Sequence, residues 1–234
     1  MVSNKNILIA QGGGPTNVIN QSLVGIIQQE KKYKSKIFGS VNGVNGIINN
    51  RIISLNKFSE NDLKIIANTP GAALGSTRDK PDGEYCKEIL KILQKKKIAK
   101  FYYIGGNDSS DSLRIISEYA DDIKYKLQCI HIPKTIDNDL VSNDHTPGFG
   151  SAAKYVAQLF SGINYDVKSL PGVYLGIVMG RHAGFLTASS ALLKRKNDDG
   201  PNLIYIPESP FEMNIFLHQI KNVFNKYGRC VIAI

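Results

Sequence analysis

The stretch 101-FYYIGGNDSSDSLRII-116 joins an apolar run to a helix-like pattern through two adjacent glycines. A short apolar run followed at once by glycines and then by helical spacing is typical of a strand, a tight turn and a helix. Glycines at such a turn let backbone N–H groups approach an anion, and the helix start adds positive potential. The stretch therefore predicts a phosphate-binding turn, although Asp108 places a carboxylate in it.

Similar apolar runs recur along the chain, and helical patterns lie between most of them. The runs cover residues 7–10, 36–41, 101–104, 127–132, 173–179, 203–206 and 230–234. Continuous apolar strands that alternate with helices are typical of a parallel sheet buried on both faces. The sequence therefore predicts an α/β fold of Rossmann-like type, with parallel or mixed sheets covered by helices.

Helix starts and helix faces are also marked in the sequence. Ser59 with Asp62 three residues later forms a capping-box pattern, which predicts a helix that begins after Ser59. Pro15 suits the first turn of a helix through residues 16–29. A helix through residues 84–96 has one apolar face, formed by Cys86, Ile89, Leu90 and Leu93.

Composition places the chain among ordinary globular proteins: 42% of its 234 residues are apolar and 21% are charged. No apolar run approaches the roughly 20 residues that span a bilayer, and residues 1–10 lack the features of a signal peptide. Cys86, Cys129 and Cys230 are widely spaced and odd in number. These features predict a cytoplasmic protein with reduced cysteines and no membrane partner.

The net charge of +9 raises the possibility of nucleic-acid binding. Much of the excess is lysine in the tracts 30-EKKYKSK-36 and 94-QKKKIAK-100, which are typical of solvated helix ends. A positive field also attracts small phosphorylated anions. We therefore expect no nucleic-acid partner.

Glycines and polar residues follow the predicted strands directly, in residues 11–17, 105–110, 133–139, 180–184 and 207–209. In parallel sheets, ligands bind beyond the carboxyl ends of the strands, so these segments are predicted to form a site. The first contains 12-GGGPTNVIN-20, which fits neither the GxGxxG nor the GxxxxGK[ST] fingerprint. It is interpreted as an anion-binding loop, with a plain strand–helix turn as the alternative.

The segment 133-PKTIDNDL-140 contains two carboxylates two residues apart, Asp137 and Asp139. One carboxylate can accept a proton from a substrate hydroxyl while the other helps to hold a metal. Lys134 can neutralise charge on a transferring phosphoryl group. The alternative is an Asp-rich turn held by its own hydrogen bonds.

In 179-MGRHAGFL-186, Arg181 directly follows a predicted strand and is suited to clamp a phosphate or sugar. His182 is the second candidate for acid–base work, although a histidine at a helix start is more often structural. Gly184 is predicted to permit close packing.

Together these stretches resemble the phosphofructokinase family. The matching pieces are 12-GGGPTNVIN-20, 75-GSTR-78, 105-GGNDS-109, 133-PKTIDND-139, 179-MGRHAG-184 and 207-PE-208. They stand in the family's order and spacing along essentially the whole chain. The resemblance implies two similar α/β domains with the active site between them. A donor domain would cover residues 1–140, and residues 141–234 would form part of a sugar-phosphate domain, incomplete because family members continue beyond Ile234.

The resemblance also implies roles for the matching residues. Asp137 would take the proton from the sugar 1-hydroxyl, and the catalytic group would further comprise Lys134, Asp108, Thr135 and Arg181. Substrate contacts would come from Gly13, Arg78, Ser109, Thr135, Asp137, Asp139, Met179, Gly180, Arg181 and Glu208. Asn107, which matches an aspartate of the ATP enzymes, and Asp139 would associate with the cofactor Mg²⁺.

Donor choice follows from two of these positions, because ATP-using members carry glycine where this chain has Asp108 and usually where it has Lys134. At both positions the chain resembles the pyrophosphate-dependent branch of the family. Asp108 would exclude the ATP α-phosphate by clash and repulsion, and Lys134 would add positive charge near the bridging phosphates. The implied glycolytic reaction transfers phosphoryl from pyrophosphate to fructose 6-phosphate, giving fructose 1,6-bisphosphate and phosphate. The implied assembly is a homo-oligomer, either a dimer or a tetramer.

Two alternatives remain open: an ATP-dependent phosphofructokinase, and a truncated inactive chain with only a binding or subunit role. The segment 166-DVKSLPGVY-174 lacks the arginine that ATP enzymes carry there, and Ile177 stands where the family often has glutamate. These departures weaken the resemblance at the sugar-phosphate side.

Overall fold

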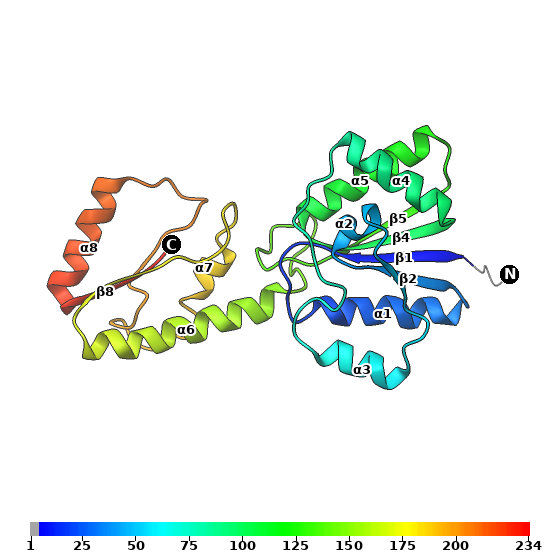
Figure 1. Cartoon of the computed structure of the whole chain (residues 1–234). Helices are drawn as coiled ribbons and strands as arrows, with labels where there is room; N and C mark the ends of the chain where they lie inside the picture. The colour runs from blue at the N-terminus through cyan, green and yellow to red at the C-terminus, as the bar shows by residue number, and fades with distance from the viewer. Residues whose placement is uncertain (1–4) are drawn as a thin grey trace. The chain divides into compact units, whose positions relative to one another are not determined.

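The computed structural model describes residues 5–234 (Figure 1). The described residues divide into two compact units, one that ends at Thr135 and one that covers Ile136–Ile234. The division falls inside the segment 133-PKTIDND-139, so Lys134 belongs to the first unit and Asp137 to the second. The predicted boundary, after residue 140, lies in the loop that follows this division.

The first unit contains a five-stranded sheet in the order β3-β2-β1-β4-β5. Its strands are β1 (Asn6–Gln11), β2 (Lys36–Ser40), β3 (Ile52–Ser54), β4 (Ile98–Gly105) and β5 (Gln128–Pro133). Neighbouring strands run parallel, except that β3 runs antiparallel to β2. The parallel order places the carboxyl ends of β1, β4 and β5 at one edge, where the glycine turns begin.

Helices cover both faces of this sheet, as the continuous apolar strands predict (Figure 1). One face carries α1 (Ile19–Lys32) and α3 (Glu60–Asn68), and the other carries α2 (Gly43–Ile48), α4 (Gly83–Lys95) and α5 (Asn107–Asp122). Successive strand residues point to opposite faces. Leu8 and Ala10 therefore pack in the core under α4 and α5, whereas Ile9 packs in the core under α1 and α3.

Two of the sequence-based helix predictions are confirmed in detail. Ser59 caps α3 through a reciprocal capping box with Asp62. The predicted apolar face of α4 is buried, at Cys86, Ile89, Leu90 and Leu93.

The predicted start of α1 is wrong, because the helix begins at Ile19 and Pro15 lies before it. The reason is that the amides of Gly12 and Gly13 donate outside the helix, to the carbonyl oxygens of Ile104 (2.8 Å) and Thr77 (2.9 Å). The chain therefore stays extended as a loop through Pro15 before it can coil.

The second unit contains a three-stranded parallel sheet in the order β6-β8-β7. Its elements are α6 (Phe149–Ser169), β6 (Gly172–Gly176), α7 (Phe185–Ser189), β7 (Leu203–Ile204), α8 (Met213–Tyr227) and β8 (Arg229–Ala233). Val156 and Phe160 of α6 pack against Val231 and Ala233 of β8 to form a small core. The strand predicted through residue 179 ends at Gly176, which leaves residues 177–184 as a loop.

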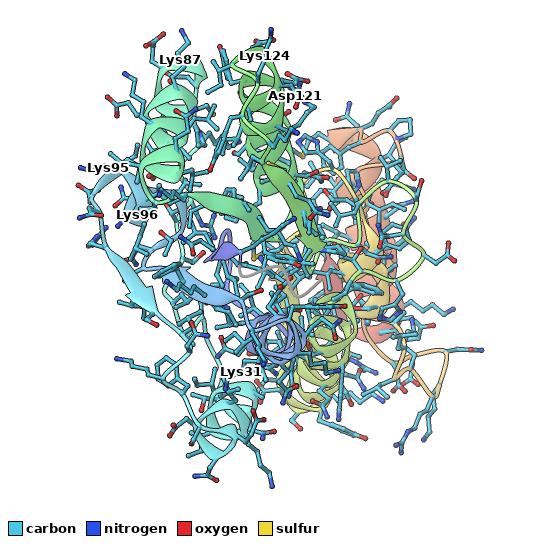
Figure 2. All side chains as sticks on the ribbon, turned by 90° about the vertical axis from the view of Figure 1, so that its right-hand side faces the viewer. Lys31, Lys87, Lys95, Lys96, Asp121 and Lys124 are labelled. Carbon is cyan, nitrogen blue, oxygen red and sulfur yellow. The ribbon has the colours of Figure 1, made fainter. Side chains whose placement is uncertain are left out.

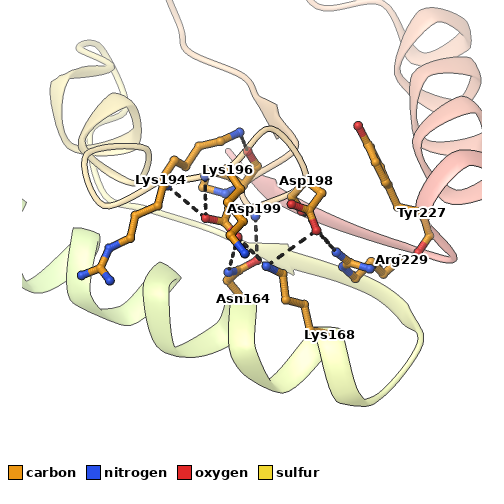
Figure 3. A network of polar contacts seen from close by, with 11 residues as sticks. Asn164, Lys168, Lys194, Lys196, Asp198, Asp199, Tyr227 and Arg229 are labelled. Atoms are coloured by element: carbon orange, nitrogen blue, oxygen red, sulfur yellow. Dashed lines mark hydrogen bonds and ion pairs between the residues drawn. The ribbon is translucent and has the colours of Figure 1, made fainter.

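A polar network ties α6 of this unit to the loop before β7 and to β8 (Figure 3). Asp199 accepts hydrogen bonds from Lys168 and Asn164 of α6, and Asp198 pairs with Arg229 at 2.9 Å. The Lys168 ammonium and the backbone N–H groups of Arg195 and Lys196 hold the pKa of Asp199 below its usual range. The network fixes the loop before β7 to α6 and to the start of β8.

Surface lysines such as Lys87, Lys95 and Lys124 extend from α4 and from the C-terminal end of α5 (Figure 2). The prediction that the lysine tracts are solvated is wrong for the charged residues Glu30 and Lys100. Glu30 is 1% exposed, and its carboxylate accepts hydrogen bonds from Lys100 (2.7 Å), Tyr102 (2.6 Å) and Ser35 (3.0 Å). Burial by itself would raise the pKa of Glu30, but these three donors together lower it.

The three cysteines are free, with Cys86 and Cys230 buried and Cys129 half-buried. Within residues 5–234, no helix combines the length and the apolar character that crossing a bilayer requires.

Replacement of Glu30 by glutamine keeps the side-chain volume but removes the charge that its three donors face. Hydrogen bonds to a charged group contribute about 1.5–3 kcal/mol, so we expect Glu30→Gln to lower the free energy of unfolding by about that amount. Chemical denaturation measures the change. The matched control is Glu118→Gln, which neutralises an exposed partner of Arg114 and is expected to change stability by less than about 0.5 kcal/mol. Equal effects of the two substitutions would contradict the buried network.

Candidate functional site

The glycine loop after β1, residues 12–14, is held from three directions. Its amides bind the carbonyls of Ile104 and Thr77, and the Ser76 hydroxyl donates to the Gly13 carbonyl at 2.5 Å. Gly13 has φ of +73°, a conformation that favours glycine, and a Cβ on Gly12 would lie 2.6 Å from Ser109 Oγ. Positions 12 and 13 therefore favour glycine, one because of its close neighbours and the other because of its backbone conformation.

Two predicted phosphate contacts, Lys134 and Arg78, lie beside this loop. The Lys134 side chain is 3% exposed, and its ammonium donates to the Gly14 carbonyl at 2.8 Å. A Cβ on Gly13 would lie 3.2 Å from Lys134 Nζ, and one on Gly14 would lie 3.9 Å from the Arg78 guanidinium. Backbone that approaches two cations this closely forms a small electropositive surface suited to a compact anion.

The second glycine turn leads directly into α5. Gly106 is the N-cap of α5 and supplies no side-chain cap, so the first-turn N–H groups are not capped by it. A Cβ on Gly105 would lie 2.1 Å from Ser109 Oγ, which makes glycine obligatory there. Ser109 is buried, whereas Asn107 and Asp108 in the same turn are exposed. The start of α5 therefore presents its positive dipole end beside the loop 12–14.

Asp108 forms an ion pair with Lys80, whose ammonium lies 3.0 Å from the Asp108 Oδ1 atom. Both side chains are about two-thirds exposed, at 69% for Lys80 and 67% for Asp108. The sequence did not single out Lys80, because no pattern in the chain indicates that this residue contacts α5.

A buried amide pair, which sequence reasoning also missed, positions the segment that carries Arg78. Gln11 and Asn20 bind each other at 3.2 Å. The side-chain Oε1 atom of Gln11 accepts the Leu74 N–H at 2.9 Å, and the side-chain Oδ1 atom of Asn20 accepts the Ala73 N–H at 2.8 Å. The sequence did contain a signal for this pair. Gln11 ends an apolar strand, where a buried polar side chain needs hydrogen-bond partners.

His131 on β5 is a further residue that the sequence did not single out. Its Nε2 atom donates to the Gly105 carbonyl at 2.8 Å, and the Lys134 N–H donates to the same oxygen at 2.9 Å. Burial lowers the pKa of His131, against hydrogen bonds to the Gly105 and Gly106 backbone that raise it. The ring thus anchors the glycine turn of α5 to the strand that leads to Lys134.

In the second unit, Asn138 organises the loop that carries Asp137 and Asp139. Asn138 has φ of +58°, a left-handed conformation that asparagine tolerates. Its side chain is buried, accepts the Thr146 N–H at 2.8 Å and donates to the Asp144 carbonyl at 3.3 Å. Half-buried Asp137 and Asp139 flank this anchor. The turn is therefore held by the asparagine between the two acids.

The segments 179–184 and 207–208 also meet within the second unit. Gly180 has φ of +130°, and a Cβ there would lie 2.4 Å from the Ala183 carbonyl. The Glu208 carboxylate accepts the Gly184 N–H at 2.8 Å, and a Cβ on Gly184 would lie 2.5 Å from Ile206. The close packing predicted for Gly184 is confirmed.

Arg181 and Met179 are exposed beside this contact, and the Arg181 Nε atom donates to His182 Nε2 at 3.1 Å. His182 therefore orients the arginine in this structure. That contact favours the structural interpretation of His182.

The described residues 5–234 contain no group of three or more His, Cys, Asp or Glu side chains that could enclose a metal ion. Asn107 of the first unit offers an amide oxygen and Asp139 of the second unit a carboxylate oxygen, and Mg²⁺ takes ligands of both kinds. The magnesium role of each residue remains a prediction.

Comparison with known proteins identifies the family, since the phosphofructokinase family model matches residues 6–234. The chain belongs to the phosphofructokinase family. It is 56% identical over 230 residues to the pyrophosphate--fructose 6-phosphate 1-phosphotransferase of Rhodospirillum rubrum, covering 97% of this chain and 57% of that protein. With the ATP-dependent 6-phosphofructokinase of Haemophilus ducreyi the identity is 30%, covering 98% of this chain and 68% of that enzyme.

A solved structure of the family agrees with the fold. The pyrophosphate-dependent phosphofructokinase from Marinobacter aquaeolei superimposes with a TM-score of 0.87 at 36% identity, covering 97% of this chain and 59% of that one. The α/β fold predicted from the sequence is confirmed. The chain spans less than two-thirds of the length of this structure and of the Rhodospirillum rubrum relative.

The lowered pKa of His131 predicts a pH dependence of stability. The unfolded chain takes up the proton near pH 6.5 and the folded chain only at lower pH, so stability is full above about 6.5 and falls as the pH drops below it. His131→Gln keeps an amide donor without a titrating ring. We expect this variant to lose part of the decrease in unfolding free energy that the unmodified chain shows between about pH 7 and pH 5.5.

Denaturation at a series of pH values provides the test. His218→Gln, which alters an exposed histidine on α8, serves as the control and is expected to keep the original pH profile. An unchanged profile in His131→Gln would show that His131 is not the titrating group.

Proposed function

We propose that this chain acts in the transfer of a phosphoryl group from pyrophosphate to the 1-hydroxyl of fructose 6-phosphate, giving fructose 1,6-bisphosphate and phosphate. One observation carries the proposal. A carboxylate, Asp108, stands in the first turn of α5, while the cations Lys134 and Arg78 flank the glycine loop 12–14 of the same unit.

This distribution of charge suits a compact donor better than a nucleotide. Pyrophosphate would place its charge at the glycine loop and the two cations, and it has no group that would extend from there to the Asp108 carboxylate. A nucleotide adds a third phosphate and a nucleoside. A like charge about 5 Å from the Asp108 carboxylate costs about 1–3 kcal/mol at effective dielectric constants between those of water and a protein surface. That range corresponds to about 5- to 150-fold in affinity. The names of the similar proteins from Rhodospirillum rubrum and Marinobacter aquaeolei agree with a pyrophosphate donor.

The second unit supplies groups for the acceptor side. Asp137 is proposed as the base that accepts the proton of the sugar 1-hydroxyl as the new O–P bond forms. The exposed Arg181 guanidinium is proposed to bind the 6-phosphate, with Met179, Gly180 and Glu208 as neighbouring sugar contacts. Since the phosphoryl group passes directly from donor to acceptor, positioning and charge stabilisation carry the rate and no covalent enzyme intermediate is needed.

Asn107 and Asp139 are the residues that would hold magnesium. When bound, the ion would neutralise charge on the donor's phosphate oxygens. Lys134 adds a fixed positive charge at the same donor, and Thr135 is proposed to contact the substrate.

A homo-oligomer is proposed as the working form. The observation that favours it is the exposed apolar surface of the second unit. Helix α8 has no buried residue, and apolar side chains remain exposed on β6 and in the loop after it, at Val173, Leu175 and Ile177. Apolar surfaces of this kind mark interaction sites. The same surface would suit a chain that serves only as a subunit, and the activity measurements below separate the two roles.

The first test removes the proposed base. We expect Asp137→Asn to lower kcat by about 100-fold or more while leaving the affinity for fructose 6-phosphate nearly unchanged, since the carboxylate acts only as the proton leaves. A coupled assay with magnesium pyrophosphate measures turnover, and calorimetry measures sugar-phosphate binding. Asp144→Asn, an exposed acid of the same loop, is the control.

The assay uses the chain by itself and the chain joined to the segment that follows the matched region in the Rhodospirillum rubrum relative. A near-normal kcat for Asp137→Asn would remove Asp137 from the role of base. Turnover by neither form would favour the subunit role.

The second test concerns the donor. Asp108→Gly removes the carboxylate that opposes a nucleotide, so ATP affinity is expected to rise by about 10- to 100-fold, equivalent to about 1.4–2.7 kcal/mol. Pyrophosphate affinity is expected to fall, because glycine loosens the turn at the start of α5. Calorimetry with each donor and magnesium measures both constants. An unchanged ratio of the two would mean that Asp108 does not choose the donor.

A further inference from the structure

Lys80, the partner of Asp108, projects from a short segment that is fixed on both sides. Before it, the Asp79 carboxylate accepts hydrogen bonds from Tyr85 (3.0 Å) and Asn45 (3.2 Å). The Asp79 N–H donates to the Thr77 hydroxyl at 3.1 Å. Burial would raise the pKa of Asp79, but its hydrogen-bond donors together lower it, so the carboxylate remains a charged anchor.

The segment is equally fixed after Lys80. Pro81 is buried, and the Asp82 side chain caps α4 by accepting the Tyr85 N–H at 2.9 Å. The backbone of Lys80 therefore has little freedom, and its ammonium has a defined reach to the first turn of α5.

Stability alone does not explain this ion pair. Both partners are about two-thirds exposed, and an exposed pair contributes only about 0–1 kcal/mol to stability. The pair does join Lys80, two residues after Arg78, to Asp108 in the first turn of α5. Its geometric effect is to restrain the Asp108 carboxylate, which otherwise has several rotamers in water.

We propose that Lys80 is a positioning residue for donor selectivity, because it holds the Asp108 carboxylate where that group opposes a nucleotide. The proposal rests on the proposed function. Selectivity for pyrophosphate over ATP then depends on a pair of residues from two segments, and Asp108 without its partner excludes ATP less well.

The ratio of the two dissociation constants separates positioning from simple charge. Loss of the Lys80 cation weakens electrostatic attraction for both donors, since both place phosphates in this part of the first unit. Loss of the restraint on Asp108 acts on ATP alone. Removal of the Lys80 cation also leaves the Asp108 charge less neutralised, which by itself would raise the ratio Kd(ATP)/Kd(pyrophosphate). A fall in this ratio therefore reports the position of Asp108.

The experiment measures this ratio by calorimetry, with magnesium present, for the unmodified chain, Lys80→Gln, Lys80→Arg, Asp108→Gly and the double variant Lys80→Gln/Asp108→Gly. We expect Lys80→Gln to lower the ratio by about two- to fivefold, the range of an exposed ion pair. Lys80→Arg keeps the charge and is expected to retain most of the ratio. The double variant is expected to match Asp108→Gly, because Lys80 acts through Asp108.

Lys87→Gln is the matched control. It removes an exposed lysine of α4 that pairs with Glu84 at 2.6 Å, and it is expected to leave the ratio unchanged. Circular dichroism verifies that each variant is folded.

The outcomes separate the two proposals. If the unmodified chain prefers pyrophosphate and Lys80→Gln keeps the full ratio, the role of Lys80 is overturned while the proposed function stands. A further fall in the ratio when Lys80→Gln is added to Asp108→Gly would also overturn it. If the unmodified chain binds pyrophosphate no better than ATP, the proposed donor fails, and the role of Lys80 fails with it.

Discussion

The ammonium group of Lys134 is almost wholly withdrawn from water, and the architecture of the first unit follows from what that burial requires. A buried charge is costly unless polar groups surround it. The Gly14 carbonyl supplies one such group at 2.8 Å, which brings the loop after β1 to the end of β5. Gly13 has φ of +73°, and a Cβ there would lie 3.2 Å from the ammonium, so glycine is favoured at this position. The same approach leaves positive charge at one edge of the sheet.

Around this contact, the structure uses fixed polar groups rather than flexible ones. The Gly105 carbonyl accepts two donors, from His131 and from Lys134, and so joins β5 to the turn that starts α5. Gln11 and Asn20 hold the segment that leads to Arg78. In the second unit, Asn138 has the same task between Asp137 and Asp139. In the proposed phosphoryl transfer, positioning and charge placed in advance would carry the rate, and these anchors would supply the positioning.

Local features of the fold were readable from the sequence, and distant pairings were not. The Ser59 capping box and the apolar face of α4 depend on residues three or four apart, so their patterns are visible in the chain order. Strand β3 is a short, partly exposed edge strand, and three residues leave no pattern to recognise. The burial of Glu30 depends on Lys100, which is far away in sequence. Glu30 also lies in a lysine-rich tract, and such a tract is typical of exposed surface. In the candidate site, too, local patterns were readable: the sequence predicted the glycine turns and singled out Lys134. The contacts of Lys80, His131 and the Gln11–Asn20 pair join residues that are distant in sequence, and they became visible only in the structure.

Backbone hydrogen exchange tests the central claim, that the glycine loop and the start of α5 form a site for pyrophosphate, most directly. The amides to follow are those of residues 12–14 and 106–109, with magnesium pyrophosphate, with magnesium ATP at the same concentration, and with neither. The account predicts slower exchange at both segments with pyrophosphate and little change with ATP. Protection confined to other segments, or equal protection by the two donors, would contradict it.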